Sequence, residues 1–222
     1  MTTVELTRIE RVAAERLAHS RAAIPDFTLE TDADVTDLLA ARRAATAAGS
    51  RPPSVNDHVL HACAAALAEP EHERLRGRFA DGAIELRDGV HLGFAVATDR
   101  GLMVPVIHDA DRLSLAELGQ RARELAEGAR AAKLGMADLT GGVFSVTNLG
   151  MLGITRFQPI IDPDHAAILS VGATRSEAVE RDGELTSREL IALTISADHR
   201  VVDGAAAARF LASVTGRLRP GG

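Results

Sequence analysis

The stretch LIALTISADHRVVDG, residues 190–204, decides how the C-terminal part of this chain folds. Its first six residues form an apolar run typical of a strand, and the alanine-rich segment from Ala205 to Leu218 has the composition of a helix. We therefore expect a strand, a turn that carries His199, and a helix that begins near Asp203. An imidazole can accept and return a proton near neutral pH, and a carboxylate at a helix start can cap the helix or hold a cation. An ordinary structural turn with an N-cap has the same pattern, so this stretch alone leaves both interpretations open.

Composition limits the class of protein. The 222 residues, of which 46% are hydrophobic and 25% charged, are enough for a full core, and no linker or repeat divides them. We expect one domain over residues 1–222. The formal charge of −6 and the absence of basic clusters with interleaved aromatic residues argue against a nucleic-acid partner. No apolar run reaches transmembrane length, no signal-peptide pattern opens the chain, and there is a single cysteine, so we expect a cytoplasmic protein without a membrane partner.

Hydrophobic spacing predicts helices and strands in an irregular order. The helices are expected over residues 7–20, 36–48, 55–69 and 114–133, and the strands over 27–35, 83–86, 90–98, 102–107, 141–150, 166–174, 178–181 and 185–195. Because these elements do not alternate as βαβ units, we expect an α/β (α+β) fold with a mixed sheet covered by helices. No glycine-rich phosphate-binding motif follows a strand, which excludes the common nucleotide-binding folds.

The helix predicted over residues 55–69 carries the groups that could suggest metal or thiol chemistry. Cys63 lies on its apolar side and is expected to pack in the core. His58 and His61 are three residues apart, but the sequence supplies no third ligand at a recognisable spacing. We therefore expect no metal site.

Four stretches together carry a family resemblance. They are RVAAERLAHS (11–20) followed by Ile24-Pro25, FSVTNLGMLG (144–153), PIIDPDHAAIL (159–169) and ADHRVVDG (197–204). In order and spacing they resemble the catalytic domain of 2-oxoacid dehydrogenase dihydrolipoamide acyltransferases, members of the chloramphenicol acetyltransferase-like superfamily. The resemblance covers nearly the whole chain.

This resemblance implies a chloramphenicol acetyltransferase-like fold and a homotrimer with active-site channels at the subunit interfaces, which acyl-CoA enters from one end and the acceptor from the other. It implies that His199 is the general base and that Thr147 donates a hydrogen bond to the oxyanion. Asn148 would shape the turn beside Thr147 and contribute to acyl-CoA binding. Asp203 would have a structural role and pair with an arginine, for which Arg11 is a candidate. The chemistry is consistent, because thiols and alcohols are mostly protonated near pH 7 and need a base to attack a thioester.

Three departures from the family pattern shape the functional expectation. The sequence has no lipoyl or subunit-binding domain, and its last residues, 217–222, offer little apolar surface to link trimers, which predicts an isolated trimer. The segment Asp162 to His165 stands where the family usually has Asn-Pro-Pro and a polar residue. We interpret His165 as a surface or loop histidine, with acceptor recognition as the alternative.

These departures favour a free-standing biosynthetic O-acetyltransferase that moves an acetyl or other short acyl group from acyl-CoA to a small or carrier-bound acceptor, such as a tetronate-type hydroxyl. Two alternatives stay open. One is the dihydrolipoamide acyltransferase core of a 2-oxoacid dehydrogenase complex. The other is a trimeric scaffold without catalytic activity.

Overall fold

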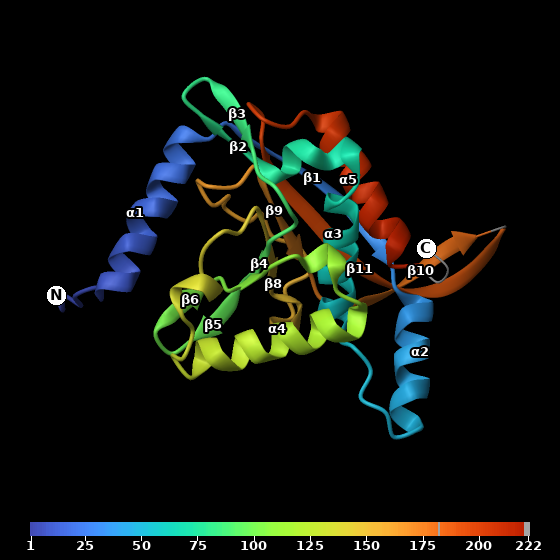
Figure 1. Cartoon of the computed structure of the whole chain (residues 1–222). Helices are drawn as coiled ribbons and strands as arrows, with labels where there is room; N and C mark the ends of the chain where they lie inside the picture. Colours follow the sequence, from blue (N-terminus) through green and yellow to red (C-terminus); the bar gives the residue numbers. More distant parts are fainter. Residues whose placement is uncertain (182, 220–222) are drawn as a thin grey trace.

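A mixed β-sheet forms the centre of the molecule (Figure 1) in the computed structural model, which describes residues 1–181 and 183–219. Its strands lie in the order β1-β11-β9-β8-β4-β7, and β10 pairs with the outer part of β11. Strand β8 runs parallel to both β4 and β9, while the other pairs are antiparallel. The expected mixed sheet with helices is confirmed.

The elements follow the chain in this order. The helices are α1 (Arg8–Ala23), α2 (Thr36–Ala47), α3 (Val55–Leu67), α4 (Leu115–Arg130) and α5 (Gly204–Arg217), with 3₁₀ turns η1 (Pro70–Arg76), η2 (Ala110–Arg112), η3 (Met136–Asp138) and η4 (Gly150–Leu152). The strands are β1 (Asp26–Asp34), β2 (Gly77–Ala80), β3 (Ala83–Leu86), β4 (Leu92–Phe94), β5 (Val96–Thr98), β6 (Gly101–Met103), β7 (Val106–Ile107), β8 (Phe144–Asn148), β9 (Ala167–Val171), β10 (Arg175–Arg181) and β11 (Glu184–Asp198).

Local capping explains where the main helices begin. Thr7, Ser54 and Ser114 each accept a hydrogen bond from the backbone N–H three residues later, and the carboxylate of the acidic residue at that position accepts one from the backbone N–H of the cap residue. Such reciprocal caps satisfy backbone groups that a helix start otherwise leaves unpaired. The predicted starts of these helices agree with the structure for this reason.

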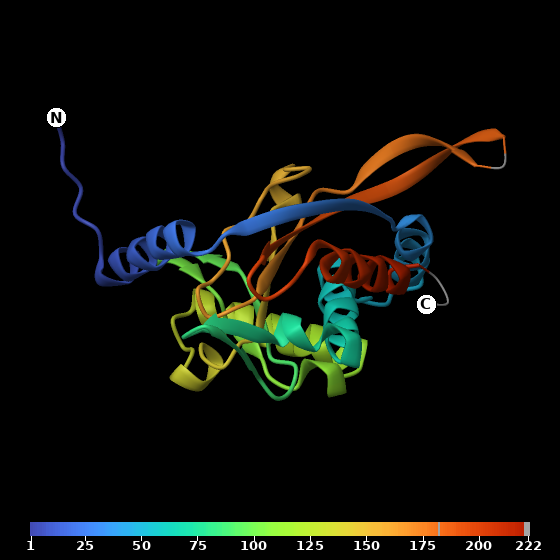
Figure 2. The same cartoon turned by 90° about the horizontal axis from the view of Figure 1, so that it is seen from above.

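Helices α3, α4 and α5 cover one face of the sheet and enclose the core (Figure 2). Phe144 of β8 and Phe210 of α5 are fully buried there, with ring centroids 5.3 Å apart. Cys63 is also fully buried, and burial raises the pKa of its thiol. The prediction that Cys63 packs in the core is confirmed.

The opposite face of the sheet is crossed by the segment 153–165. The Ser170 hydroxyl on β9 donates to the Phe157 carbonyl at 2.7 Å, and the Ala173 amide donates to the Ile154 carbonyl at 2.8 Å. A Cβ atom at position 172 would lie 1.8 Å from the Thr155 carbonyl oxygen, so only glycine allows this close crossing. The crossing segment therefore lies tightly against the sheet.

Helix α1 stands beside the body of the molecule (Figure 2) and contacts this crossing segment. Arg16 donates to Asp162 and Asp164 at 2.7 and 2.8 Å, and the Ser20 hydroxyl donates to the Ile161 carbonyl at 2.6 Å. The apolar side chain of Leu17 on α1 is 45% exposed, so the rest of this protomer does not fully cover it. Among the described residues, no helix has the length and apolar character needed to cross a membrane.

Candidate active site

The turn after β11 holds His199 at the surface. Its backbone is fixed because the His199 amide donates to the Pro25 carbonyl at 3.1 Å, and its ring packs against Phe27 with centroids 4.8 Å apart. The neighbouring Asp198 is buried and accepts three hydrogen bonds from the Arg200 guanidinium, at 2.9, 3.2 and 2.7 Å, as well as one from the Arg200 amide at 2.9 Å. Because these bonds fix the turn and the imidazole is exposed, His199 can contact a group from outside the protomer.

Asp203 caps the helix that follows this turn. Its carboxylate accepts a hydrogen bond from the Ala206 amide at 2.7 Å, and this bond lowers the pKa of Asp203. The sequence suggested Arg11 as its partner, but within one protomer the Arg11 guanidinium donates to the Leu6 carbonyl. In this chain Asp203 shapes the start of α5, and no pairing with Arg11 is formed among the described residues.

Thr147 and Asn148 lie at the end of β8, and both are half-buried. The Asn148 side chain donates to the Asn56 side-chain oxygen at 2.9 Å and accepts from the Gly150 amide at 2.8 Å. Asn148 thus shapes the turn after β8, as the sequence predicted. The partner Asn56 was missed, because a polar residue in the first turn of a helix carries no signal of a contact made far along the chain.

The sheet register separates Thr147 from His199 within one protomer. Thr147 pairs with Ser170 on β9, and Ser170 pairs with Thr194 on β11, five residues before His199. Standard strand geometry puts the two residues about 17 Å apart along the strands and about 10 Å apart across them, or about 20 Å in all. One chain therefore does not bring the predicted base and the predicted hydrogen-bond donor together.

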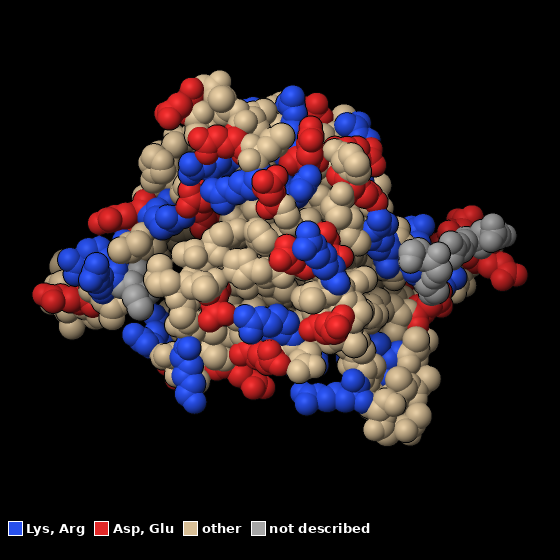
Figure 3. All heavy atoms as spheres, in the orientation of Figure 1, with Lys and Arg blue, Asp and Glu red and all other residues tan. Residues whose placement is uncertain are grey.

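Two cavities meet at Thr147. The first, of about 540 Å³, is also lined by Asn148, and three arginines, Arg51, Arg123 and Arg130, contribute to its wall. Figure 3 shows charged side chains of both signs around an uncharged central area on the face that it draws. The helix expected over residues 114–133 gave no sign in the sequence that two of its arginines line a cavity.

The second cavity, of about 420 Å³, lies between α1 and the sheet. Its wall includes Ser145 and Thr147 of β8, and Leu17 and Arg16 of α1. The shared residue Thr147 connects it to the first cavity.

His165 is not a surface histidine. It is 8% exposed, and its Nδ1 lies 3.1 Å from the Ser145 hydroxyl. The expectation of an exposed loop position is wrong because the segment 153–165 folds across the sheet and carries His165 down onto β8. Burial lowers the pKa of His165.

The described residues contain one group that could hold a metal ion. It consists of Glu69, Glu71 and His72, whose ligand atoms lie within 4.8 Å of one another. The Glu69 carboxylate already accepts hydrogen bonds from Ser213 and Arg217. This group is at η1, away from the cavities at Thr147, and it includes neither His58 nor His61.

The fold defines the class of protein first. Chloramphenicol acetyltransferase superposes with a TM-score of 0.56 over 97% of this chain and 99% of that protein, at 21% sequence identity. At this identity the likeness shows the fold alone, and it confirms the expected chloramphenicol acetyltransferase-like architecture.

The family is narrower than the fold. The profile of the 2-oxoacid dehydrogenases acyltransferase (catalytic domain) family matches residues 1–220, and the chain belongs to this family. It is 35% identical over 209 residues to the acetyltransferase component of the Rickettsia felis pyruvate dehydrogenase complex, covering 92% of this chain and 50% of that protein. The solved structure of Azotobacter vinelandii dihydrolipoamide acetyltransferase has a TM-score of 0.91 at 37% identity, covering 98% of this chain and 91% of that one.

These relatives correct the functional expectation. A biosynthetic O-acetyltransferase acting on a tetronate-type hydroxyl was expected, but the similar proteins are dihydrolipoyllysine-residue acetyltransferase components of 2-oxoacid dehydrogenase complexes. The expectation is wrong because it relied on segments absent from this sequence and on the substitutions near His165, neither of which reports on the acceptor. The chain spans about half the length of the curated relatives it matches.

Proposed function

We propose that residues 1–222 form the catalytic unit of a dihydrolipoamide acetyltransferase that works in a 2-oxoacid dehydrogenase complex. The reaction moves an acetyl group between the thiol of CoA and a thiol of a dihydrolipoyl group. The observation that carries this proposal is the family match over almost the whole chain, together with conserved spacing of the reactive residues.

The spacing comes from the Azotobacter vinelandii enzyme, whose structural study concerns a serine, a histidine and an asparagine in the catalytic mechanism. In that enzyme the histidine follows the serine by 52 positions and precedes the asparagine by four. Here His199 follows Thr147 by the same 52 positions and precedes Asp203 by four. Thr147 and Asp203 therefore stand where the relative has serine and asparagine.

The chemistry follows from these side chains. His199 accepts the proton of the attacking thiol as its sulfur bonds to the carbonyl carbon of the thioester, which contributes roughly a hundredfold to ten-thousandfold in rate. The Thr147 hydroxyl donates a hydrogen bond to the oxyanion of the tetrahedral intermediate. Collapse of the intermediate breaks the original carbon–sulfur bond, and His199 returns the proton to the leaving thiolate.

This mechanism requires two protomers. Since about 20 Å separate His199 from Thr147 along the sheet of one chain, the base must come from a neighbouring copy. The exposed ring of His199, on a turn fixed by Asp198 and Arg200, suits that role. A cyclic trimer, in which each interface joins the two ends of different sheets, satisfies the requirement at every site.

The 540 Å³ cavity fits the acyl-CoA co-substrate. Arg51, Arg123 and Arg130 would neutralise the phosphates of the nucleotide part, because guanidinium groups match phosphate geometry. Phe94 of β4, Val96 of β5 and Ala122 of α4 also line this cavity together with Thr147, and their apolar side chains suit contact with the pantetheine chain. In this arrangement the thioester arrives beside the Thr147 hydroxyl.

The test compares acceptors. Purified protein is incubated with acetyl-CoA and either dihydrolipoamide or a set of small alcohols, and release of CoA and the acetylated product is measured. We expect turnover with dihydrolipoamide and its loss in His199→Ala. Turnover of an alcohol in preference to dihydrolipoamide, or unchanged activity of His199→Ala, would refute the proposal. Absence of any transfer by the assembled wild-type protein would favour a scaffold.

A further inference from the structure

The reaction described above does not use a buried hydroxyl and a buried imidazole that contact each other. Ser145 and His165 are 4% and 8% exposed, and the Ser145 hydroxyl lies 3.1 Å from the His165 Nδ1. The two residues come from different elements, β8 and the segment that crosses the sheet, and their contact lies between two cavities. Ser145 lines the 420 Å³ cavity, while His165 lines a second cavity of about 830 Å³.

Each ring nitrogen of His165 faces a different group. Nε2 lies 3.3 Å from the position that a Cβ atom would take at Gly142. Burial lowers the pKa of His165, and the Gly142 backbone acts against this lowering, as a carbonyl beside a ring N–H does. Nδ1 lies 3.1 Å from the Ser145 hydroxyl. In the tautomer with its proton on Nε2, Nδ1 accepts the hydrogen bond of the Ser145 hydroxyl, and this is the tautomer that can take the Ser145 proton.

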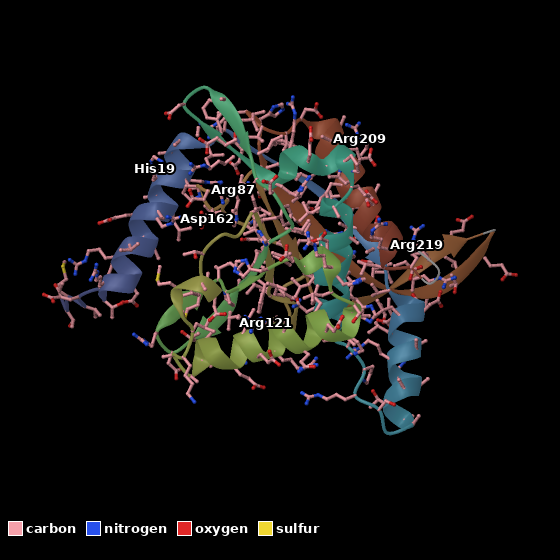
Figure 4. The ribbon with its side chains drawn as sticks, in the orientation of Figure 1. His19, Arg87, Arg121, Asp162, Arg209 and Arg219 are labelled. Atoms are coloured by element: carbon pink, nitrogen blue, oxygen red, sulfur yellow. The ribbon has the colours of Figure 1, made fainter. Side chains whose placement is uncertain are left out.

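Surrounding groups keep the ring of His165 neutral and in place. Burial, the largest influence, lowers the pKa of His165, and the positive charge of Arg87 acts in the same direction, while Asp162 and Asp164 act against them. Arg87 donates to the Gly142 carbonyl at 2.9 Å, which fixes the acceptor of the His165 N–H. Figure 4 shows Arg87 and Asp162 on the side of the body that faces α1.

Ser145 also stands at a useful distance from Thr147. Residues two apart on a strand point to the same face, here the face opposite the core residue Val146, with a spacing of about 6.7 Å. A carbonyl group fits between two such hydroxyls. A nucleophile about 3.2 Å from the carbon approaches at an oblique angle to the C=O bond, and an oxyanion donor lies about 2.8 Å from the oxygen, so the two hydroxyls of such a site lie about 6 Å apart. Side chains on Cα atoms about 6.7 Å apart can reach this distance.

We propose that Ser145 and His165 form a second acyl-transfer centre, in which the Ser145 hydroxyl attacks the acyl-CoA thioester presented beside Thr147. The inference rests on the proposed function only for the delivery of that thioester. Ser145 Oγ bonds to the carbonyl carbon as its proton passes to His165 Nδ1. The carbon–sulfur bond then breaks, His165 gives the proton to the CoA thiolate, and the acyl group remains as an ester on Ser145. Water, deprotonated by His165, later attacks the ester and releases the carboxylic acid and the free serine.

The consequence is a slow thioester hydrolysis that needs no dihydrolipoyl acceptor and no neighbouring His199. The 420 Å³ cavity behind Ser145 has room for an acetyl group and for a somewhat longer acyl chain. The Arg16 side chain of α1, which binds Asp162 and Asp164, forms part of the wall of both cavities at the pair.

The test traps the ester. Protein is incubated with acetyl-CoA without acceptor, quenched in acid, digested and analysed by mass spectrometry for acetyl groups on the peptide that contains Ser145. We expect acetylation in wild-type protein and in His199→Ala, and its loss in Ser145→Ala and His165→Gln. Glutamine can still accept the Ser145 hydrogen bond but cannot take a proton. CoA release without acceptor should fall at least about a hundredfold in both of these variants.

Ser196→Ala is the matched control. Ser196 is fully buried, it lies in the same row across the sheet as Ser145, and its hydroxyl faces Thr28 at 3.5 Å without an imidazole. It should behave as wild type. If wild-type protein transfers acetyl to dihydrolipoamide but never carries acetyl on Ser145, the second centre does not exist and the proposed function stands. If Ser145 is acetylated without transfer to dihydrolipoamide, the proposed function fails and the second centre stands.

Discussion

Mixing two inactive variants should restore activity, because Thr147 and His199 lie at opposite ends of one sheet. Alone, Thr147→Ala should lose roughly a hundredfold to a thousandfold in rate through the missing oxyanion donor. Alone, His199→Ala should lose roughly a hundredfold to ten-thousandfold through the missing base. In a mixed oligomer, an interface is intact when the Thr147→Ala chain supplies His199 and the His199→Ala chain supplies Thr147.

The magnitude follows from the geometry of a ring of three chains. In a cyclic trimer that carries both variants, in either ratio, one of the three interfaces pairs an intact Thr147 with an intact His199, so about a third of the sites are intact. The assay coexpresses the two chains with different affinity tags, purifies trimers that carry both, and measures acetyl transfer to dihydrolipoamide. Activity of about a third of wild type is expected from the same count. If the mixed assemblies are no more active than the better single variant, the base and the donor do not come from different protomers and the reasoning is refuted.

Three further predictions follow from individual contacts. Arg123→Gln should raise the KM for acetyl-CoA several-fold with little change in kcat, because Arg123 lines the proposed acyl-CoA cavity. Arg43→Gln, at an exposed position of α2, is the control and should change neither constant. Steady-state kinetics at low and high salt measure both constants. Asp203→Ala should lower the melting temperature by about 2–4 °C because the cap of α5 is lost, and Asp203→Asn, which keeps a capping oxygen, should not. Burial lowers the pKa of His165 in the folded chain below the ordinary value of 6.5. As the pH falls below about 6.5, the unfolded chain therefore binds more protons than the folded chain, and the stability of the fold should decrease. Thermal melts of His165→Gln should show a smaller decrease with falling pH than those of wild-type protein.

Local patterns predicted most of the secondary structure because local interactions determine it. The helix starts at Ser54 and Ser114 depend on side chains three residues away, and Gly49, with φ of +80°, ends α2 as its position indicated. The strands over residues 90–107 were predicted less accurately. Its two expected strands are four in the structure, because β4 and β7 join the main sheet while β5 and β6 form a separate ribbon. Nothing in a run of branched residues records which partner each part will pair with.

The candidate site was also predictable only in part. His199 was noticed from its place on a turn between a strand and a helix, while Thr147 and the role of His199 came from the family resemblance, and both roles stay proposals. Their separation within one chain was not visible there, because it depends on the register of β8, β9 and β11. The burial of His165 was not predicted either, because it results from a segment that crosses the sheet over residues far away in sequence.

The opposite placement of the two reactive groups has a consequence for genetics. In the closed ring that the proposed mechanism requires, each protomer would contribute its histidine to one interface and its threonine to another. A chain that lacks both side chains therefore disables two sites at once, although it folds and assembles normally. In a cell that also makes the intact chain, the fraction of activity lost would exceed the fraction of chains that carry the change. The defect would then be inherited as a dominant trait.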